Sequence, residues 1–335
     1  MPTRLLVMLW QPDVERTSTL SLKSKLNLLL MPALKHAYDV FEDFKKKYIE
    51  DESRLLFVGP EHFFTNAGNA YSLEHKQIIQ HYLQEWSKEK PNCIWIPGSV
   101  KWGENLPHEM AQRAQLIASM TMPCFRYYKN LGMNFHEQPD FKRLVSDEDL
   151  DLIHNTAIVY CNGQTQEYNK QTAYKELTEE EQKTATFGFG AESPIIKFAG
   201  LTVGLEIGSD HDHNLLNNIA AKQLIDAHVV LSKSLPSLAD AIACHQRGIY
   251  VHCDNNATKN SLVLPFQNGQ GQEVQNLDKA QELGLIWWEA SIELASHYPS
   301  HEEAMNSLTM DFSAMSIQTL RKVNIYPKKG QTAHC

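Results

Sequence analysis

Short apolar runs that end in glycine, proline or a charged residue alternate along this chain with longer segments of helical periodicity. Apolar runs of about four to eight residues, rich in β-branched and aromatic side chains, are typical of buried strands. We predict strands at 4–10, 55–59, 93–96, 155–161, 164–170, 203–207, 227–232, 249–254 and 262–265. Helical spacing predicts helices at 22–48 and 73–86, and further helices at 107–120, from Asn214 onward, at 238–247 and beyond Asp278. This alternation favours an α/β protein with helices packed outside its sheets.

The stretch 200–213 ends a predicted strand with Gly208, Ser209 and a row of aspartates and histidines. A strand, a sharp turn and a helix N-terminus favour a nucleophile, because the turn exposes its side chain and the free amides receive an oxyanion. Gly208 stands at that place. We expect Asp210 or Asp212 to cap the following helix, which explains these aspartates more simply than a metal site does.

Two further charged residues follow predicted strands, Glu61 after an apolar run and Lys170 after a hairpin strand. A carboxylate base, an ammonium and a nucleophile at one rim of a sheet form an acyl-transfer site. Considered alone, Glu61 is either solvated or partly buried, and its apolar neighbours favour burial. Considered alone, Lys170 is more often a surface lysine.

The order of these motifs resembles that of the nitrilase superfamily of carbon–nitrogen hydrolases over roughly residues 4–268. The motifs that carry the resemblance are Pro60-Glu61, Pro97-Gly98-Ser99, Asn155-Thr156-Ala157, Tyr168-Asn169-Lys170, Gly204 to Asp210, Asp226 to Leu231 and Arg247 to Asn255. The resemblance implies a four-layer α-β-β-α sandwich that usually forms dimers through its outer helices. It also implies hydrolysis of amides, nitriles or carbamoyl compounds by a glutamate base, an oxyanion-stabilising lysine and a nucleophilic cysteine.

Glu61 and Lys170 match the base and the lysine, and the family's cysteine falls at Gly208. The second family glutamate follows the lysine, and its candidates are Glu176, which we place first, Glu179, Glu180 and, with less support, Glu192. Ser209 is a candidate replacement for the missing thiol. A serine is a weaker nucleophile and needs a base placed for it.

Three functions therefore remain open. The first is a catalytically degenerate family member that retains a pocket for a small amide, nitrile or carboxylate. The second is an active amidase-type hydrolase whose cysteine was artificially replaced by Gly208, or whose nucleophile is Ser209. The third is a non-enzymatic interaction scaffold that uses the loops of 101–151. We expect a hydrolase-like domain at 1–277, a helical extension and tail at 278–335 packed on it, and a homodimer.

The amino-acid composition limits the kinds of partner and the cellular compartment that we expect for this chain. The formal net charge is −9, and no basic patch with interleaved aromatics is present, which disfavours nucleic acid. The longest apolar runs are too short to span a membrane. The six cysteines form no CxxC pair, as in a cytoplasmic protein with reduced thiols. We expect no metal and no cofactor, Cys161 and Cys253 in the core, and Trp287-Trp288 in the core or a subunit interface.

Overall fold

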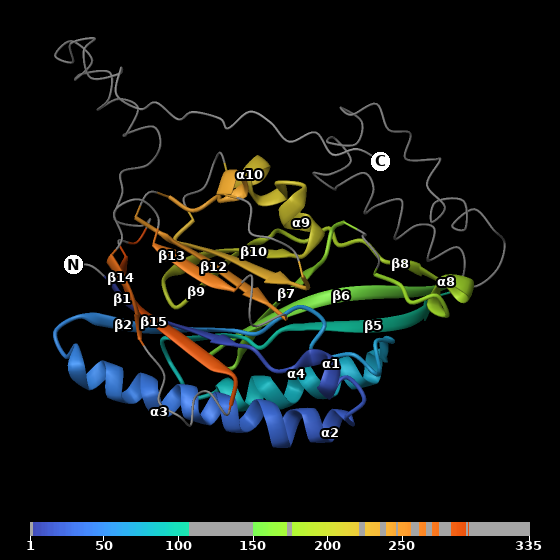
Figure 1. Cartoon of the computed structure of the whole chain (residues 1–335), viewed down its shortest axis with the longest axis horizontal. Coiled ribbons are helices and arrows are strands. Elements are labelled where there is room, and N and C mark those ends of the chain that lie inside the picture. The colour runs from blue at the N-terminus through green and yellow to red at the C-terminus, as the bar shows by residue number, and fades with distance from the viewer. Residues whose placement is uncertain are drawn as a thin grey trace, which may run out of the picture. The chain divides into compact units, whose positions relative to one another are not determined.

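The computed structural model describes residues 3–106, 150–172, 176–220, 225–234, 239–245, 247–255, 261–265, 270–274, 283–292 and 294. All of them lie within one compact unit, Met1–Ala295. The protein is of the mixed α/β class (Figure 1). No helix in the described ranges is long and apolar enough to cross a membrane.

The described strands form two sheets. The larger sheet has the order β14-β15-β1-β2-β4-β6-β5-β3, with β7 and β8 paired to β6. Its strands are β1 Thr3–Trp10, β2 Glu52–Val58, β3 Tyr71–Ser72, β4 Cys93–Ile96, β5 Ser99–Leu106, β6 Leu150–Cys161, β7 Gln164–Asn169, β8 Ala185–Phe187, β14 Gln270–Val274 and β15 Leu285–Ile292. The smaller sheet is β13-β12-β11-β10-β9. Its strands are β9 Ile195–Phe198, β10 Leu201–Ile207, β11 Ala227–Ser232, β12 Ile249–Asp254 and β13 Leu262–Pro265.

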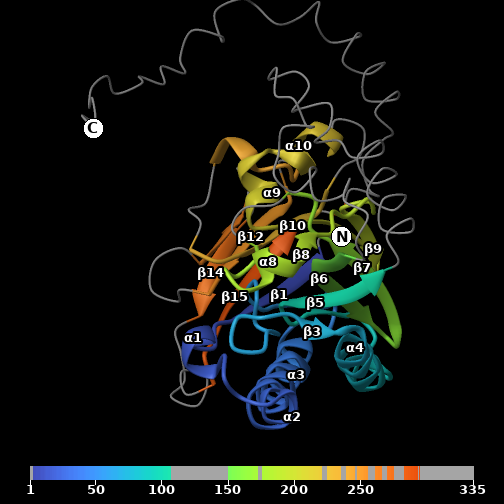
Figure 2. The same cartoon turned by 90° about the vertical axis from the view of Figure 1, so that its right-hand side faces the viewer.

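Helices cover the outer faces of the two sheets, and one short helix, Glu181–Thr184, lies at their edge (Figures 1 and 2). They are α1 Val14–Thr17, α2 Leu22–Ser24, the π-helical Lys25–Leu30, α3 Met31–Lys47, α4 Leu73–Ser87, α8 Glu181–Thr184, α9 Ser209–Asp212, α10 Leu215–Ala220 and the 3₁₀ turn Ala239–Ala241. One core cluster joins α3 and α4 to the larger sheet, a second fills the space between the sheets, and a third joins α10 to the smaller sheet.

The alternation of side chains along β1 explains how one strand serves two of these clusters. Leu6, Met8 and Trp10 belong to the cluster under the helices, whereas Leu5, Val7 and Leu9 belong to the cluster between the sheets. Successive side chains of a strand point to opposite faces, so a strand buried on both faces reads as a continuous apolar run. The pattern that predicted the strands therefore has a direct structural cause.

All nine predicted strands are confirmed, as are the helix at 73–86 and the start of the helix near Asn214, whose later part lies outside the described residues. The predicted helix at 22–48 is confirmed with a π-helical segment inside it, and Pro32 lies at the start of α3. Cys161 and Cys253 are buried as predicted. The helix predicted at 107–120 lies outside the described residues.

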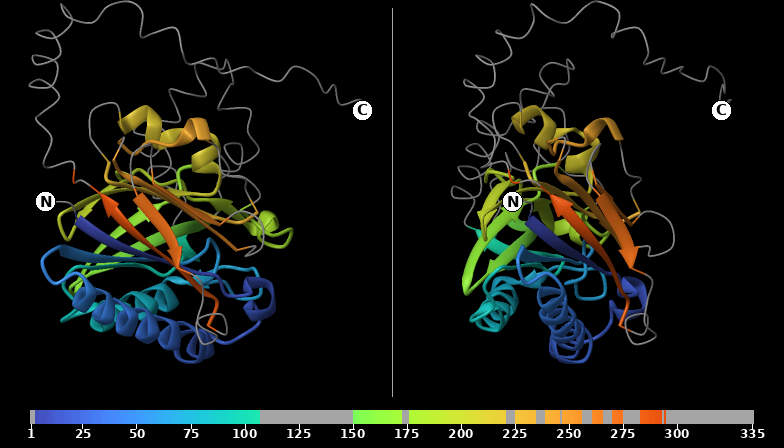
Figure 3. Two further views of the ribbon diagram at one scale, coloured as in Figure 1. Left: turned by 60° about the vertical axis from the view of Figure 1, so that its left-hand side comes forward. Right: turned by 90° about the vertical axis from the view of Figure 1, so that its left-hand side faces the viewer.

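Two helix predictions are wrong over the residues that the structure describes. The segment 238–247 holds a short 3₁₀ turn, Ala239–Ala241, and the residues described after it are not helical. Of the helical segments predicted beyond Asp278, the described part instead forms the strand β15, which pairs antiparallel with β1 (Figure 3), and most of residues 279–335 lie outside the described residues. Trp287 packs in the cluster under the helices and Trp288 against the cluster between the sheets, so these neighbouring tryptophans face opposite sides of β15. The predicted domain boundary after residue 277 remains a prediction, although β15 lies beyond it.

Candidate functional site

The site is built around the turn between β10 and α9. Gly208 has φ 51° and ψ −116°, a conformation that residues with a Cβ rarely adopt. The Gly208 amide donates to the carbonyl of Leu231 at 2.7 Å, and the Gly208 carbonyl accepts from the amide of His211 at 3.0 Å. The neighbouring strand and the helix therefore hold the turn from both sides. A sharp strand-to-helix turn is also the geometry that presents a nucleophile in many hydrolases.

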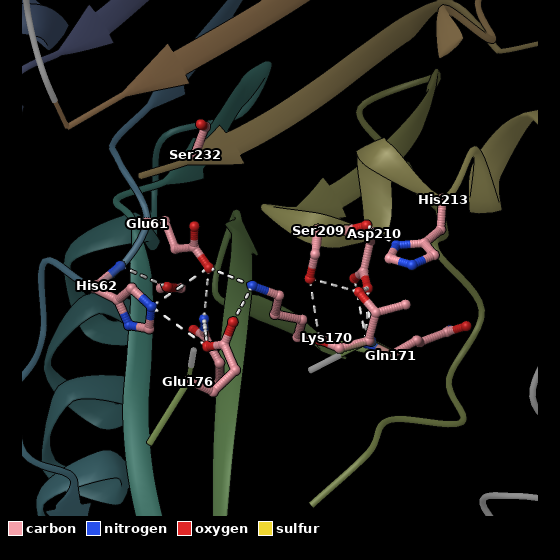
Figure 4. A network of polar contacts seen from close by, with 12 residues as sticks. Glu61, His62, Lys170, Gln171, Glu176, Ser209, Asp210, His213 and Ser232 are labelled. Atoms are coloured by element: carbon pink, nitrogen blue, oxygen red, sulfur yellow. Dashed lines mark hydrogen bonds and ion pairs between the residues drawn. The ribbon is translucent and has the colours of Figure 1, made fainter. Parts of the chain in front are cut away.

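Three predicted charged residues meet beside this turn (Figure 4). The Lys170 ammonium donates to Glu61 Oε1 at 2.8 Å and also to Glu176 Oε1. The Asn155 side-chain amide donates to Glu61 Oε1 at 2.9 Å and to Glu176 Oε2 at 3.3 Å. All four side chains are buried. We call these four residues the charge cluster.

Gly208 touches the charge cluster. A Cβ built on its backbone would lie 2.7 Å from both Glu61 Oε2 and Lys170 Nζ, a separation that real Cβ atoms essentially never show. The position that the resemblance assigns to the nucleophile therefore adjoins the predicted base and the predicted lysine. The same contact leaves no room for a side chain at 208 unless these charged groups shift.

Opposite charges stabilise the ionised side chains of Glu176 and Lys170 in the charge cluster. Burial acts to raise the pKa of Glu176, but the Lys170 ammonium and His62 lower this pKa to about 2. Burial acts to lower the pKa of Lys170, but Glu61, Glu176 and Asp210 raise it above its usual value. The cluster is thus an ion network in which the carboxylates of Glu61 and Glu176 both pair with the one ammonium of Lys170.

The loop after Glu61 is fixed by contacts from distant elements. The buried Lys25 of the π-helical segment donates to the carbonyls of Phe63 at 3.1 Å and Thr65 at 2.6 Å, and burial lowers its pKa to about 8. The His62 amide donates to Ser99 Oγ at 2.9 Å. Gly98 has φ 113°, and a Cβ there would lie 2.6 Å from the carbonyl of Pro60. The Pro97-Gly98-Ser99 motif therefore permits the close approach that places Glu61.

Asp210 ties the segment that carries Lys170 to the turn that carries Gly208. Its buried carboxylate accepts from Tyr168 Oη at 2.7 Å, from the Thr172 amide at 2.8 Å, from Thr172 Oγ1 at 2.7 Å and from the Gln171 amide. Asp210 and Asp212 were predicted to cap the helix near Asn214, which is α10, but both lie within the preceding short helix α9, and the Leu216 amide in the first turn of α10 donates to Glu206 rather than to either aspartate. Asp210 is instead bonded to the chain on either side of Lys170.

Burial raises the pKa of Asp210 to about 7, and Lys170 and the hydrogen bonds offset only part of this effect. Between about pH 4 and 7 the folded state then binds more protons at Asp210 than the unfolded state, so this contribution to stability falls as pH rises. We expect Asp210→Asn to remove that slope: the stability of the wild type relative to the variant should decline from pH 4.5 to 7 and level off above it. Urea unfolding of both proteins across this range measures the difference, and two parallel curves would contradict it.

A second buried cluster lies beneath the same turn. Glu206 Oε2 lies 2.7 Å from His211 Nδ1 and 2.9 Å from His228 Nε2, and Glu206 Oε1 accepts from the Leu216 amide at 2.7 Å. Burial acts to raise the pKa of Glu206, but hydrogen bonds from both histidines lower it to about 2. This carboxylate connects β10, α9, α10 and β11. It therefore supports the turn at Gly208 from below.

Two groups of side chains have the donor spacing of a metal site, Glu206 with His211 and His228, and Glu61 with His62 and Glu176. In the first group, His228 Nδ1 accepts from the Ala243 amide at 3.1 Å, so the neutral ring carries its proton on the nitrogen that a metal would need. In the second, the Lys170 ammonium already bridges the two carboxylates. Neither arrangement fits a metal ion well.

The remaining predicted candidates lie apart from the charge cluster. Ser209 Oγ pairs with Thr172 Oγ1 at 2.7 Å, and in Figure 4 it lies on the Asp210 side of Lys170, away from Glu61. Glu179 is exposed, Glu180 pairs with Lys183, and Glu192 accepts from the Asn169 side chain. Of the four candidate glutamates, Glu176 is the one in contact with Lys170.

Sequence reasoning gave no role to Asn155, His62, Lys25 or Glu206. Asn155 and Glu206 both stand in quoted motifs and so left a signal, whereas Lys25 lies beside the polar Lys23 and Ser24, just before the apolar run 26–34. His62 and Lys25 left no signal, because Glu176 beside His62 and the carbonyls that Lys25 binds lie far away from them in the sequence.

A pocket of about 350 Å³ adjoins the charge cluster. Glu176 and His62 line it, and Gly208, Glu61 and Lys170 do not. Its other lining residues are Val14, Glu15, Ser18, Thr65, Ala67, Gly68, Lys101, Leu177, Thr178, Lys233 and Asn255. A ligand in this pocket would meet the cluster at Glu176 and His62.

No protein-family model matches the chain, and no curated protein matches it. Among solved structures, it is similar to an amidase from Nesterenkonia sp. at 12% identity and a TM-score of 0.45, covering 91% of this chain and 96% of that one. A mutant of that amidase in complex with butyramide gives 13% and 0.44, with 91% and 96% covered. A cysteine-to-serine mutant of the Nesterenkonia AN1 amidase, described as from the nitrilase superfamily, gives 12% and 0.45, with 92% and 97% covered. At these sequence identities and TM-scores the matches support no inference about activity. Any inference about function must therefore rest on the residues of this chain.

Proposed function

We propose that this chain is a carbon–nitrogen hydrolase homologue of the nitrilase type that has lost its nucleophile and retains a small-molecule pocket. The observation that carries the proposal is the meeting of Glu61, Lys170 and Glu176 at the turn of Gly208. These residues come from three separate segments, and the resemblance assigns them the roles of base, oxyanion stabiliser and second carboxylate. The wider proposal includes a four-layer α-β-β-α sandwich and a homodimer through outer helices.

The same geometry supports loss of catalysis. A covalent mechanism needs a side chain that forms the acyl intermediate, and glycine has none. Lys170 Nζ and Glu61 Oε2 lie where that side chain would begin. The two charged groups therefore neutralise each other in the place where they would otherwise act on a thiol.

An active hydrolase that uses Ser209 has less support. The Ser209 hydroxyl is buried, pairs with Thr172 Oγ1 and also lies 3.3 Å from the Thr172 carbonyl. A nucleophilic serine needs a base within hydrogen-bond reach. The hydrogen bonds of Ser209 instead hold its hydroxyl against Thr172, in the segment after Lys170. The interaction-scaffold alternative depends on the loops of 101–151, most of which lie outside the described residues.

We expect no turnover of simple amides, nitriles or carbamoyl amino acids, since loss of a covalent nucleophile typically costs many orders of magnitude in rate. Ammonia release from a panel of these compounds measures it. Glu61→Gln is the control, because it removes the base that any activity of this site requires. Turnover in the unmodified protein that disappears in the control would contradict the loss of catalysis.

A further inference from the structure

We infer that Lys25 is a proton-operated latch on the loop 61–65: its charged ammonium favours opening of the loop, and its neutral amine favours the closed form. This inference concerns regulation of the candidate site and rests on the proposed function for the role of that site. His62 and Thr65 of the loop line the pocket, whereas Glu61, the residue before them, does not. A ligand in the pocket therefore reaches Glu61 only when the loop moves.

Lys25 holds the loop with a charge that has no opposite charge beside it. Its side chain is fully buried, and its ammonium donates to the carbonyls of Phe63 at 3.1 Å and Thr65 at 2.6 Å. It also faces the rings of Phe63, at 5.7 Å, and Tyr71, at 6.0 Å. No carboxylate of the described residues pairs with it, and burial is what lowers its pKa to about 8. Carbonyl dipoles and ring faces offset only part of the cost of burying a charge, so the closed loop favours the neutral amine.

The loop also has strained backbone near both of its ends. His62 has φ 59°, and Ala67, just beyond the loop, has φ 50°, both in the left-handed region that residues with a Cβ rarely adopt. Such residues persist where surrounding contacts hold them, and they are typical of switch segments. The contacts here include burial of the Phe63 and Phe64 rings in the cluster under the helices, so the open form is a minor one. The proton on Lys25 then sets how often that minor form occurs.

The direction of the effect follows from which form binds the proton more tightly. In the closed form the pKa of Lys25 is about 8, and in an open form that exposes Lys25 to water it returns toward its ordinary value of 10.5. Between these values the open form binds more protons, so raising the pH favours the closed form. With Lys25 fully hydrated in the open form, the opening equilibrium should fall about tenfold from pH 7 to pH 9.

The other titratable groups around Lys25 and the loop explain this change less well. Burial raises the pKa of Tyr71, on β3, to about 12, so its phenol stays neutral in this window. The pKa of Glu176 is lowered to about 2 and that of Lys170 is raised above its usual value, so both keep their charges. Glu61 and His62 lie on the loop itself, and variants of Lys25 separate their contribution from that of the latch.

Hydrogen exchange with millisecond labelling, read by peptide mass spectrometry, measures the opening on the full chain without a ligand. The reporting amides are those of His62 and Phe64, which donate to Ser99 Oγ and to the Ser99 carbonyl. After correction for the intrinsic exchange rate, their protection should rise about tenfold from pH 7 to pH 9.

Two variants test the origin of this rise. Lys25→Met and Lys25→Gln should both abolish it, whatever they do to the protection at pH 7, since neither side chain takes up a proton in this window. Lys90→Gln is the matched control, because Lys90 also donates to backbone carbonyls, those of Trp86 and Lys88, and burial also lowers its pKa. This variant should keep the rise.

Equal protection of the loop at the two pH values overturns the latch, and that comparison needs only the unmodified protein. Protection that falls toward pH 9 also overturns it, because the charge then holds the loop closed. A rise that survives Lys25→Met overturns the role of Lys25 and assigns the pH dependence to the other groups of the loop. The exchange experiment involves neither turnover nor a ligand, so failure of the latch leaves the proposed function to its own test.

Discussion

Replacing Lys170 with methionine should lower the free energy of unfolding by about 3–5 kcal/mol, the usual result of breaking a buried ion pair by removing one partner. Glu61 and Glu176 would remain buried beside each other with Asn155 and His62 as their donors. Their mutual repulsion adds to the cost of their burial. The effect should be largest near pH 8 and smaller near pH 4.5, because protonation of the carboxylates then relieves the uncompensated charge.

Chemical denaturation at the two pH values measures this effect. Lys183→Met removes a lysine from the exposed pair with Glu180, and such pairs are worth only about 0–1 kcal/mol. Combining Lys170→Met with Glu61→Gln and Glu176→Gln should recover part of the loss, since no buried charge then lacks a partner. Equal effects of Lys170→Met and Lys183→Met would mean that water reaches the charge cluster in solution.

Gly208→Cys should destabilise the protein and create its most reactive thiol among the residues that the structure describes. A side chain at φ 51° and ψ −116° costs about 1–3 kcal/mol in backbone strain, and Glu61 and Lys170 must also move away from the new Cβ. The Lys170 ammonium would then stabilise a thiolate. By contrast, burial raises the pKa of the thiols of Cys93, Cys161, Cys244 and Cys253.

Brief alkylation with iodoacetamide followed by peptide mass spectrometry compares these thiols. Gly208→Ala is the matched control for stability, because it adds the strained Cβ without the thiol. The two variants should lose similar stability, and the position 208 peptide should be labelled before those of the four buried cysteines. A folded Gly208→Cys protein labelled no faster at 208 than at Cys161 or Cys253 would favour the interaction-scaffold alternative.

The sequence predicted the strands well because most of them are buried and leave continuous or alternating apolar runs. It also predicted Glu61 and Lys170 as site residues, because each lies at or just after the end of a recognisable strand-like run. These two residues are 109 positions apart in the chain. The order of the motifs supplied their pairing, which local pattern alone could not. Among the four candidate glutamates, the sequence placed Glu176 first without a physical argument for that choice, and contact with Lys170 is what distinguishes Glu176.

The missed features depend on contacts that no local pattern encodes. Aspartate is a residue type that often caps helices, but the hydrogen bonds that Asp210 accepts come from residues about 40 positions earlier in the chain. Its carboxylate accepts from the amides of 171 and 172, which would otherwise be buried without partners. At 285–292 two adjacent tryptophans obscured the strand alternation, because both faces of that strand meet a core.

The position of β15 in the larger sheet has a consequence for how the protein is synthesised. β1 leaves the ribosome before the other described strands, yet one of its two neighbours, β15, is completed only at Ile292. At typical translation rates of about 5–20 residues per second, β1 waits on the order of 15–60 s for that neighbour. During this time β1 has an unpaired apolar edge, the kind of edge that recruits other chains. Nascent chains stalled before residue 285 should therefore bind chaperones more strongly than chains released after it.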